Sequence, residues 1–145
     1  MTADPRSAAA RVLGEVAARG QATLAEHDAK QVLAAYGLPV TREILVTRRA
    51  EVGPAAAAIG YPVALKVSSP QIPHRSEQGL VRLGLAGEAA ALAAFDALAP
   101  ALEARPGGIL VQEMVPGPRE LAMGLVRDPD FGPCVMFGLG GIFTE

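Results

Sequence analysis

The stretch YPVALKVSSPQIPHR, residues 61–75, combines a strand pattern with two residues that are unusual in such a place. Alternating apolar positions predict a β-strand, and the same alternation puts Lys66 on the opposite face, between the small residues Ala64 and Ser68. A loop with two prolines follows and carries His74, one of two histidines in the chain. The pattern raises the question of why a half-buried strand presents an ammonium group with a histidine just beyond it.

Both residues have two interpretations on the pattern alone. A lysine on the outer face of a strand is ordinarily solvated. The small neighbours of Lys66 also leave room for an anion such as phosphate, which the compact charge of a lysine suits. In the same way, His74 is either an ordinary surface residue or a nucleophile and phosphate carrier that a stiff loop presents to a substrate.

Length and composition exclude several classes of protein. A chain of 145 residues, 50% of them hydrophobic, can bury the core of one modest domain, and a net charge of −2 does not favour binding to nucleic acid. The single Cys134 fits a reducing compartment. The N-terminus carries charges where a signal peptide is apolar, and no uncharged run approaches the roughly 18 apolar residues of a membrane span. We therefore expect a cytoplasmic protein without a membrane segment.

Periodicity and chain-breaking residues predict alternating helices and strands, which indicates class α/β or α+β. We expect helices over 6–19, 23–36, 49–59 and 87–103. We expect strands over 39–46, 63–67, 80–85, 109–115, 120–126 and 133–137.

Local signals refine two of these elements. Thr23 and Glu26 have the spacing of a capping box, which predicts that the second helix starts at Thr23. The positions of that helix expected to face inward are Leu24, Ala29, Val32, Leu33 and Tyr36. The sequence Pro116-Gly117-Pro118 predicts a hairpin-like connection between the strands 109–115 and 120–126.

That connection has a carboxylate on each side, Glu113 and Glu120, which can reach the same cleft. The alternative is one exposed carboxylate and one partner for Arg119. Glycines 138, 140 and 141 do not match the dinucleotide-binding pattern and indicate a turn or bulge. The final residues, GGIFTE (140–145), have the pattern of an apolar strand, so we expect the chain to stop inside a domain.

Four spaced blocks resemble the ATP-grasp portion of the ADP-forming acyl-CoA synthetases, the acetate–CoA ligases related to succinyl-CoA synthetase. The blocks are LAEHDAKQVLAAYGLPV (24–40), YPVALKVSSPQIPHRSEQG (61–79), ILVQEMVPGPRELAMGLVRDPDFGP (109–133) and FGLGGIFTE (137–145). The resemblance implies an ATP-grasp fold in three segments. These are a leader helix at 1–21, the first subdomain at 22–112, and the hinge with an incomplete second subdomain at 113–145.

The resemblance also implies roles for single residues. Lys66 contacts nucleotide phosphates in this interpretation, His74 relays a phosphoryl group to ADP, and Glu120 binds the ribose hydroxyls. The hinge holds adenine through backbone and side-chain groups at Gln112, Glu113, Met114 and Val115. The chain departs from the family pattern at Leu80, where a second glycine is usual, and at Arg75, where a lysine is common.

The implied reaction is acyl-CoA + ADP + phosphate ⇌ carboxylate + CoA + ATP. It uses ATP or ADP with Mg²⁺, whose ligands are expected beyond residue 145, so no metal ligand is assigned in this chain. The expected partner is the CoA-binding subunit or domain of the same enzyme, in an oligomer that takes acyl-CoA or a carboxylate as substrate. We expect little activity from this chain alone.

An alternative of a different class is a non-catalytic ATP-grasp module. Such a module is a regulatory or assembly piece, or the synthetase-like region of a protein acetyltransferase. Biotin-carboxylase-like and peptide-ligase proteins share the fold but have a glycine-rich loop without the histidine, so the loop SPQIPHRS favours the acyl-CoA synthetases.

Overall fold

The computed structural model describes residues 4–72, 78–103, 105–117 and 120–140. The chain divides into two compact units, Met1–Met114 and Val115–Glu145. The mixture of helices and strands predicted from the sequence is confirmed. Within the described residues, no helix is both long and apolar enough to cross a membrane.

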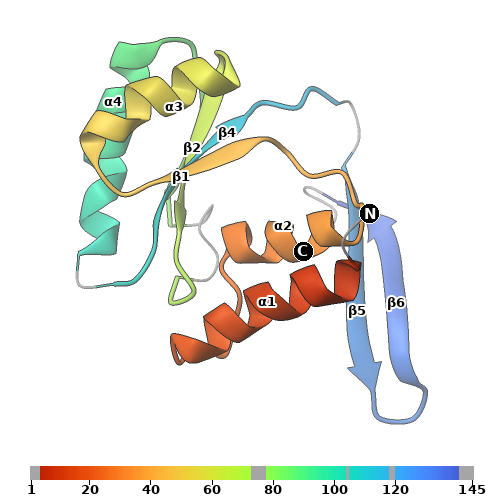
Figure 1. Ribbon diagram of the computed structural model, residues 1–145. Helices are drawn as coiled ribbons and strands as arrows, with labels where there is room; N and C mark the ends of the chain where they lie inside the picture. Colours follow the sequence, from red (N-terminus) through yellow and green to blue (C-terminus); the bar gives the residue numbers. More distant parts are fainter. Residues whose placement is uncertain (1–3, 73–77, 104, 118–119, 141–145) are drawn as a thin grey trace. The chain divides into compact units, whose positions relative to one another are not determined.

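The first unit is built around a four-stranded antiparallel sheet with the strand order β1-β4-β2-β3 (Figure 1). Its strands are β1 (Glu43–Val46), β2 (Val63–Ser68), β3 (Val81–Leu85) and β4 (Gly108–Glu113). The register opposes Lys66 of β2 to Leu110 of β4, and Ala64 to Gln112. Since side chains alternate along a strand, this register decides which residues share a face of the sheet.

One face of the sheet carries the hydrophobic core. Helices α3 (Val52–Ile59) and α4 (Glu88–Leu98) cover it, together with the short 3₁₀ turns η1 (Arg49–Glu51) and η2 (Ala99–Leu102). Small alanines on these helices allow close packing on the sheet, and Leu98 of α4 is fully buried. The strands contribute the apolar side chains predicted to point inward from β2, with partners on β1 and β4: Val46, Val63, Leu65, Val67, Ile109 and Val111.

Two further helices, α1 (Pro5–Ala18) and α2 (Glu26–Ala35), lie on the other side of the strands (Figure 1). Helix α1 begins after Asp4, whose carboxylate accepts a hydrogen bond from the amide of Arg6, and it buries three apolar residues, Ala9, Val12 and Val16. It packs on α2, which buries no residue of its own. Apolar packing therefore contributes less to holding α2 than it does for α1.

The second unit is an antiparallel hairpin of β5 (Leu121–Asp128) and β6 (Gly132–Leu139). The carboxylate of Asp128 accepts hydrogen bonds from the amides of Asp130 and Phe131, both at 2.9 Å, and so stabilises the turn. Three cross-strand pairs form one face of the hairpin, all six side chains at least 60% exposed. This apolar hairpin face consists of Leu121 and Leu139, Met123 and Phe137, and Leu125 and Val135.

The predicted hairpin between β4 and β5 is wrong. Strand β4 has β1 on one side and β2 on the other, so neither of its edges is available to β5. Strand β5 pairs with β6 instead, through the turn at Asp128. The two prolines before β5 suggested a tight turn there. The turn that forms a hairpin instead follows β5 and leads into β6.

The prediction for the start of α2 is also wrong. The helix begins at Glu26 after Ala25, which supplies no side-chain cap, and the hydroxyl of Thr23 donates instead to the carbonyl oxygen of Pro70 at 3.3 Å. Two of the side chains expected to face inward, Leu33 and Tyr36, are 45% and 56% exposed. The face of α2 that meets the sheet is polar.

Candidate functional site

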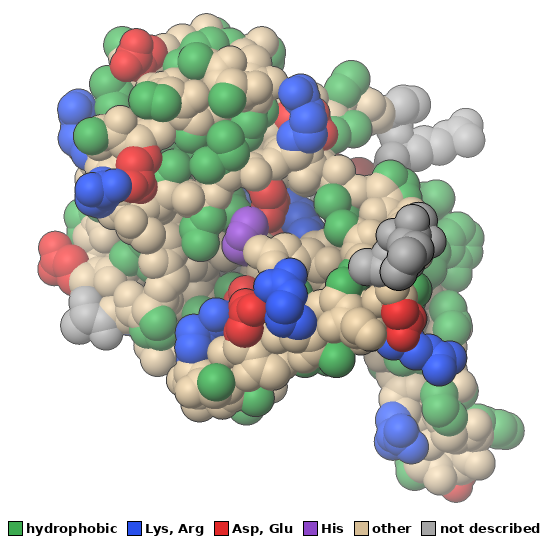
Figure 2. Space-filling model, in the orientation of Figure 1, with side chains coloured by type: hydrophobic (Ala, Val, Ile, Leu, Met, Phe, Trp, Pro, Cys, Tyr) green, Lys and Arg blue, Asp and Glu red, His purple; other side chains and the backbone are tan. Residues whose placement is uncertain are grey.

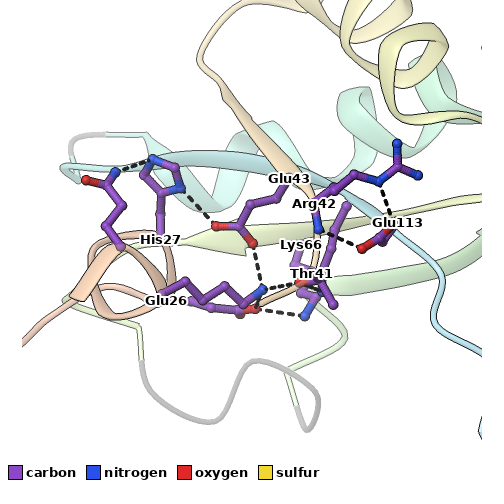
Figure 3. Close-up of polar contacts among 10 residues, drawn as sticks. Glu26, His27, Thr41, Arg42, Glu43, Lys66 and Glu113 are labelled. Atoms are coloured by element: carbon purple, nitrogen blue, oxygen red, sulfur yellow. Dashed lines mark hydrogen bonds and ion pairs between the residues drawn. The ribbon is translucent and has the colours of Figure 1, made fainter. Parts of the chain in front are cut away.

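Lys66 lies on the sheet face opposite the core, as the alternation predicted. The same face includes Ala64 and Ser68 of β2 and Gln112 of β4, and we call it the Lys66 face. The Lys66 side chain is only 23% exposed, and its Nζ donates to Oε1 of Glu26 on α2 at 2.9 Å (Figure 3). Lys66 is therefore an ion-paired, partly buried lysine rather than a solvated one.

Lys30, one turn further along α2, binds the same carboxylate oxygen of Glu26, at 2.8 Å. Its Nζ also donates to Oε2 of Glu43 at 2.6 Å and to Oγ1 of Thr41 at 2.9 Å (Figure 3). A lysine has three N–H donors, and here each has an acceptor. Lys30 thus joins α2 to β1 and to the segment that precedes it.

His27 completes this set of polar contacts. Its Nδ1 lies 2.9 Å from Oε1 of Glu43, and its Nε2 lies 2.8 Å from Nε2 of Gln31. We call Glu26, His27, Lys30, Thr41, Glu43 and Lys66 the polar cluster. Ion pairs and hydrogen bonds of this cluster link α2 to the sheet, which explains how a helix without a buried residue is held there.

The charges of the cluster shift the pKa values of Glu26 and Lys30. Burial alone would raise the pKa of Glu26, but hydrogen bonds from Lys30 and Lys66 and their positive charges outweigh it and lower the pKa to about 2. Burial alone would lower the pKa of Lys30, and its bonds to Glu26 and Glu43 raise it above its usual value. Glu26 is therefore a charged carboxylate at neutral pH when it accepts hydrogen bonds from the two lysines.

Two polar side-chain atoms of the Lys66 face have no hydrogen-bond partner among the described residues. They are Oγ of Ser68, which is 2% exposed, and Oε1 of Gln112, which is 7% exposed. The amide nitrogen of Gln112 donates to Thr41 at 2.6 Å, so this side chain is fixed with its oxygen unpaired. An unpaired buried polar atom costs about 1–3 kcal/mol, which indicates a site for a polar ligand or for water.

The side chain of Glu113 lies on the other face of the sheet, because it follows Gln112 along β4. Its carboxylate accepts from the backbone amide of Arg42 and from Nε of the same residue, both at 2.7 Å (Figure 3). The backbone bond and the guanidinium of Arg42 lower the pKa of Glu113. Any contribution of Glu113 to the Lys66 face therefore comes from its backbone.

The remaining predicted site residues belong to three different parts of the chain. Met114 ends the first unit and Val115 begins the second; they are 38% and 65% exposed. Glu120 precedes β5 in the second unit, where its carbonyl oxygen accepts from the amide of Gly140 at 2.8 Å. His74 lies outside the described residues.

Cavities are found next to the polar cluster. A space of about 180 Å³ is lined by His27, Lys30, Thr41 and Glu43 with neighbouring residues, and Figure 2 shows charged side chains of both signs and a histidine around a hollow. A second space, of about 220 Å³, is lined in part by Ser68. A larger open groove of about 530 Å³ runs beside β1 and contains none of the predicted site residues.

Most residues of the polar cluster were not predicted from the sequence. The sequence predicted α2 as an apolar packing helix, whereas Glu26, Lys30 and His27 are the residues that meet the sheet. The signal that could have found them is the i, i+4 spacing of Glu26 and Lys30, because such a pair places opposite charges on one stripe of a helix. A carboxylate in the first turn of a helix is also favoured by the helix dipole.

No group of three or more His, Cys, Asp or Glu side chains that could hold a metal ion occurs in the part of the chain that the structure describes. The charged side chain of the Lys66 face, as defined above, is Lys66 itself. The compact charge of a lysine suits an anion such as phosphate.

Comparison with known families assigns the chain to a class. Residues 15–145 match the ATP-grasp domain family, and the chain therefore belongs to this family. The predicted ATP-grasp fold is confirmed by this match and by the solved structures that follow.

Within this family, the chain is similar to subunits of ADP-forming acetate–CoA ligases. The chain is 41% identical to the acetate–CoA ligase [ADP-forming] II subunit beta of Pyrococcus furiosus, over 94% of this chain and 60% of that one. A crystal structure of a Pyrococcus horikoshii protein matches with a TM-score of 0.87 and 42% identity, over 94% of this chain and 60% of that one. The predicted relationship to the ADP-forming acyl-CoA synthetases is thus confirmed.

A ligand-bound structure is also similar. The dinucleotide-forming acetyl-coenzyme A synthetase 1 of Ca. Korarchaeum cryptofilum, in complex with coenzyme A, Ca-AMPCP and HgCl⁺, matches with a TM-score of 0.84 and 39% identity. The match covers 91% of this chain and 60% of that one. The chain thus spans about three fifths of the length of these relatives.

Proposed function

We propose that the chain is the nucleotide-binding part of an ADP-forming acyl-CoA synthetase. The reaction is acyl-CoA + ADP + phosphate ⇌ carboxylate + CoA + ATP. The observation that carries the proposal is the composition of the Lys66 face. A partly buried lysine lies there with two buried side-chain oxygens, Oγ of Ser68 and Oε1 of Gln112, that have no hydrogen-bond partner among the described residues. The similarity to a synthetase solved with a nucleotide analogue supports the same assignment.

Lys66 serves in this proposal as the ligand of the nucleotide phosphates. One of its three N–H donors is used by Glu26 in the described structure, and an ammonium can direct the others to phosphate oxygens. Phosphoryl transfer depends mainly on positioning and on neutralising negative charge, and a fixed lysine supplies both. The unpaired Oε1 of Gln112 is an acceptor suited to an N–H donor of the base.

His74 serves as the phosphoryl carrier. A ring nitrogen of His74 holds the phosphoryl group, an oxygen of the terminal phosphate of ADP attacks the phosphorus, and the P–N bond breaks as the new P–O bond of ATP forms. Glu120 and the backbone of Glu113, Met114 and Val115 would hold the ribose and adenine. These assignments rest on the sequence resemblance.

The described residues contain no group of three or more His, Cys, Asp or Glu side chains that could hold magnesium. The complete reaction also needs a CoA-binding subunit or domain and an acyl-CoA or carboxylate substrate. The relatives include subunits named beta, which supports a partner chain in an oligomer.

ATP binding to the 145-residue chain tests the role of Lys66. Loss of a hydrogen bond to a charged group predicts that Lys66→Ala weakens ATP binding roughly 10- to 100-fold in calorimetry. The control is Arg49→Ala, which removes an equal charge from an exposed ion pair with Asp96 and should leave affinity unchanged. Equal affinities of the wild type and Lys66→Ala would contradict the proposal.

The role of His74 is tested in a chimera in which this chain replaces the matching part of the Pyrococcus furiosus beta subunit. With the CoA-binding partner, radiolabelled ATP and magnesium, the chimera should acquire an acid-labile phosphoryl label that His74→Asn abolishes. A label that persists in His74→Asn would refute the relay. ATP binding without any label would favour the non-catalytic module.

A further inference from the structure

The carboxylate of Glu26 is shared by two lysines that come from different elements. Its Oε1 lies 2.9 Å from Nζ of Lys66 on β2 and 2.8 Å from Nζ of Lys30 on α2 (Figure 3). The carboxylate is 18% exposed, so water reaches only a small part of it. Glu26 is therefore the contact through which α2 determines where the Lys66 ammonium lies.

The two lysines differ in their other contacts. Lys30 also reaches Glu43 and Thr41, so its three donors are all engaged. Within the described ranges, Lys66 donates a hydrogen bond to Glu26, which leaves two of its donors for a ligand. Lys30 is placed to anchor the helix, and Lys66 is placed to receive an anion.

Holding Lys66 in one position favours binding. A lysine side chain carries about 2 kcal/mol of rotamer entropy, and ordering it before the ligand arrives removes part of that cost from the binding step. Glu26 can order it because Glu26 is itself fixed, as the first residue of α2 with a second cation on the same oxygen. A bond from His27 to Glu43 and the bonds of Lys30 keep α2 in place.

A carboxylate next to a phosphate-binding lysine could also compete with the phosphate. Here Lys30 reduces that competition, since its positive charge offsets the charge of the Glu26 carboxylate that Lys66 also contacts. Glu26 can thus orient the Lys66 ammonium without cancelling its attraction for an anion.

We propose that Glu26 is the positioning residue of Lys66, holding its ammonium on the sheet face so that two donors face the phosphates. This inference rests on the proposed function of Lys66 as a phosphate ligand. Glu26 acts through Lys66 and does not itself contact the nucleotide.

Calorimetric titration of the 145-residue chain with ATP tests the proposal in four variants: Lys66→Ala, Glu26→Ala, Glu26→Gln and the double variant Lys66→Ala/Glu26→Ala. Glu26→Ala should weaken ATP binding about tenfold, as expected when a hydrogen bond to a charged group is lost. Glu26→Gln keeps an oxygen acceptor for Lys66 and should stay within about threefold of the wild type, since only the charge is lost. The double variant should bind ATP like Lys66→Ala, because coupled residues are not additive.

Glu43→Gln is the matched control, because it removes a carboxylate that contacts Lys30 and His27 but not Lys66. It should lower the midpoint of thermal unfolding and weaken ATP binding by less than Glu26→Ala does, because Glu43 reaches Lys66 only through α2. A loss of affinity in Glu43→Gln as large as in Glu26→Ala would assign the effect to loosening of α2 and overturn the positioning role.

The remaining outcomes separate this inference from the proposed function. Wild-type or tighter binding by Glu26→Ala, with weak binding by Lys66→Ala, overturns the role of Glu26 and leaves Lys66 as the phosphate ligand. Unchanged binding by Lys66→Ala overturns both. Because Glu26→Gln retains the hydrogen bond, its rescue of affinity distinguishes positioning from a general loss of folding.

Discussion

Glu26 connects the acid stability of the fold to its candidate site. Its pKa is about 2 in the folded chain, against an ordinary value of 4.5. A carboxyl group with a lowered folded pKa stabilises the fold above its unfolded pKa, and the contribution disappears as the pH falls toward the folded pKa. The Glu26 contribution is thus present above about pH 4.5 and lost as the pH falls to about 2.

We therefore predict that Glu26→Gln lowers the free energy of unfolding at pH 7 by up to about 3 kcal/mol. The difference from the wild type should shrink as the pH falls through the window from 4.5 to 2, where Glu26 becomes protonated. Urea unfolding at a series of pH values measures it. Other carboxylates titrate in both proteins and cancel in the difference, so a constant difference across this window would contradict the ion pairs of Glu26.

A second prediction concerns Gly107, which precedes β4. Its φ of 140° is a conformation that side chains rarely adopt, and a Cβ there would overlap the carbonyl oxygen of Ser68. Gly107→Ala should therefore destabilise the chain by about 2–3 kcal/mol in urea unfolding. Gly14→Ala is the control, since Gly14 lies in α1 with no atom within 4 Å of the added Cβ, and it should stabilise the chain by up to about 1 kcal/mol. Equal effects of the two changes would argue against the close approach at Ser68.

At the scale of elements, α2 and α4 are held by different forces. Helix α4 buries four side chains in the core, whereas α2 buries none and depends on its polar contacts. Elements with few buried apolar contacts open at a lower free energy than the global one. Backbone amides of α2 should therefore exchange with deuterium faster than those of α4.

Glu43→Gln should increase amide exchange in α2 about tenfold, because it removes the negative charge of the ion pair with Lys30 that links α2 to β1. Asp96→Asn is the control, since it breaks the exposed pair of Arg49 and Asp96, and it should change exchange by less than about twofold. Hydrogen exchange with mass spectrometry measures both. Exchange of α2 as slow as that of α4 would show that packing, not the polar cluster, holds this helix.

The sequence predicted the elements that have a strong period or a clear stop. The alternation in β2 placed Lys66 on the correct face, and Gly60 ended α3 as expected, with a φ of 95°. The α2 prediction did not hold, because its apolar residues suggested a buried face although the charged stripe of Glu26 and Lys30 meets the sheet. Pairing of β5 could not be predicted locally, since it depends on β1 and β2 occupying both edges of β4.

In the candidate site, too, residues with a local sequence pattern could be predicted, whereas contacts between distant residues could not. Lys66 and Gln112 could be singled out from the sequence because each belongs to a strand block with a recognisable pattern, and the structure places them on one face. The ion pair between Lys66 and Glu26 joins residues 40 positions apart, so only the folded chain reveals it. The role of His74 stays a prediction, because His74 lies outside the described residues.

At the scale of the molecule, the apolar hairpin face is the main exposed hydrophobic feature of the second unit. Its six side chains form three adjacent cross-strand pairs and thus a contiguous apolar patch. Single exposed apolar residues are ordinary on protein surfaces, but such a patch is not. Among the strands that the structure describes, the outer edges of β5 and β6 also have no pairing partner. We therefore predict that the 145-residue chain self-associates as its concentration rises.

The pair of changes Met123→Lys and Phe137→Glu should reduce this self-association, since it places an ion pair across the strands in place of apolar side chains. Leu83→Lys is the control, because Leu83 is 64% exposed but lies in the first unit, and it should have little effect. Light scattering over a range of concentrations measures the mean mass. A wild-type chain that stays monomeric throughout would refute the prediction.

The two faces of the four-stranded sheet assign core packing and ligand binding to alternate residues of the same strands. The core side chains of these strands are at odd-numbered positions, 63, 65 and 67 of β2 and 109 and 111 of β4, and even-numbered positions carry Lys66 and Gln112 on the opposite face. Random mutagenesis of these strands should therefore give a tolerance profile that repeats every second codon, with melting temperature sensitive to one set and ligand affinity to the other. Substitutions on the ligand-binding face can therefore change ligand affinity during evolution while the hydrophobic core on the other face stays the same.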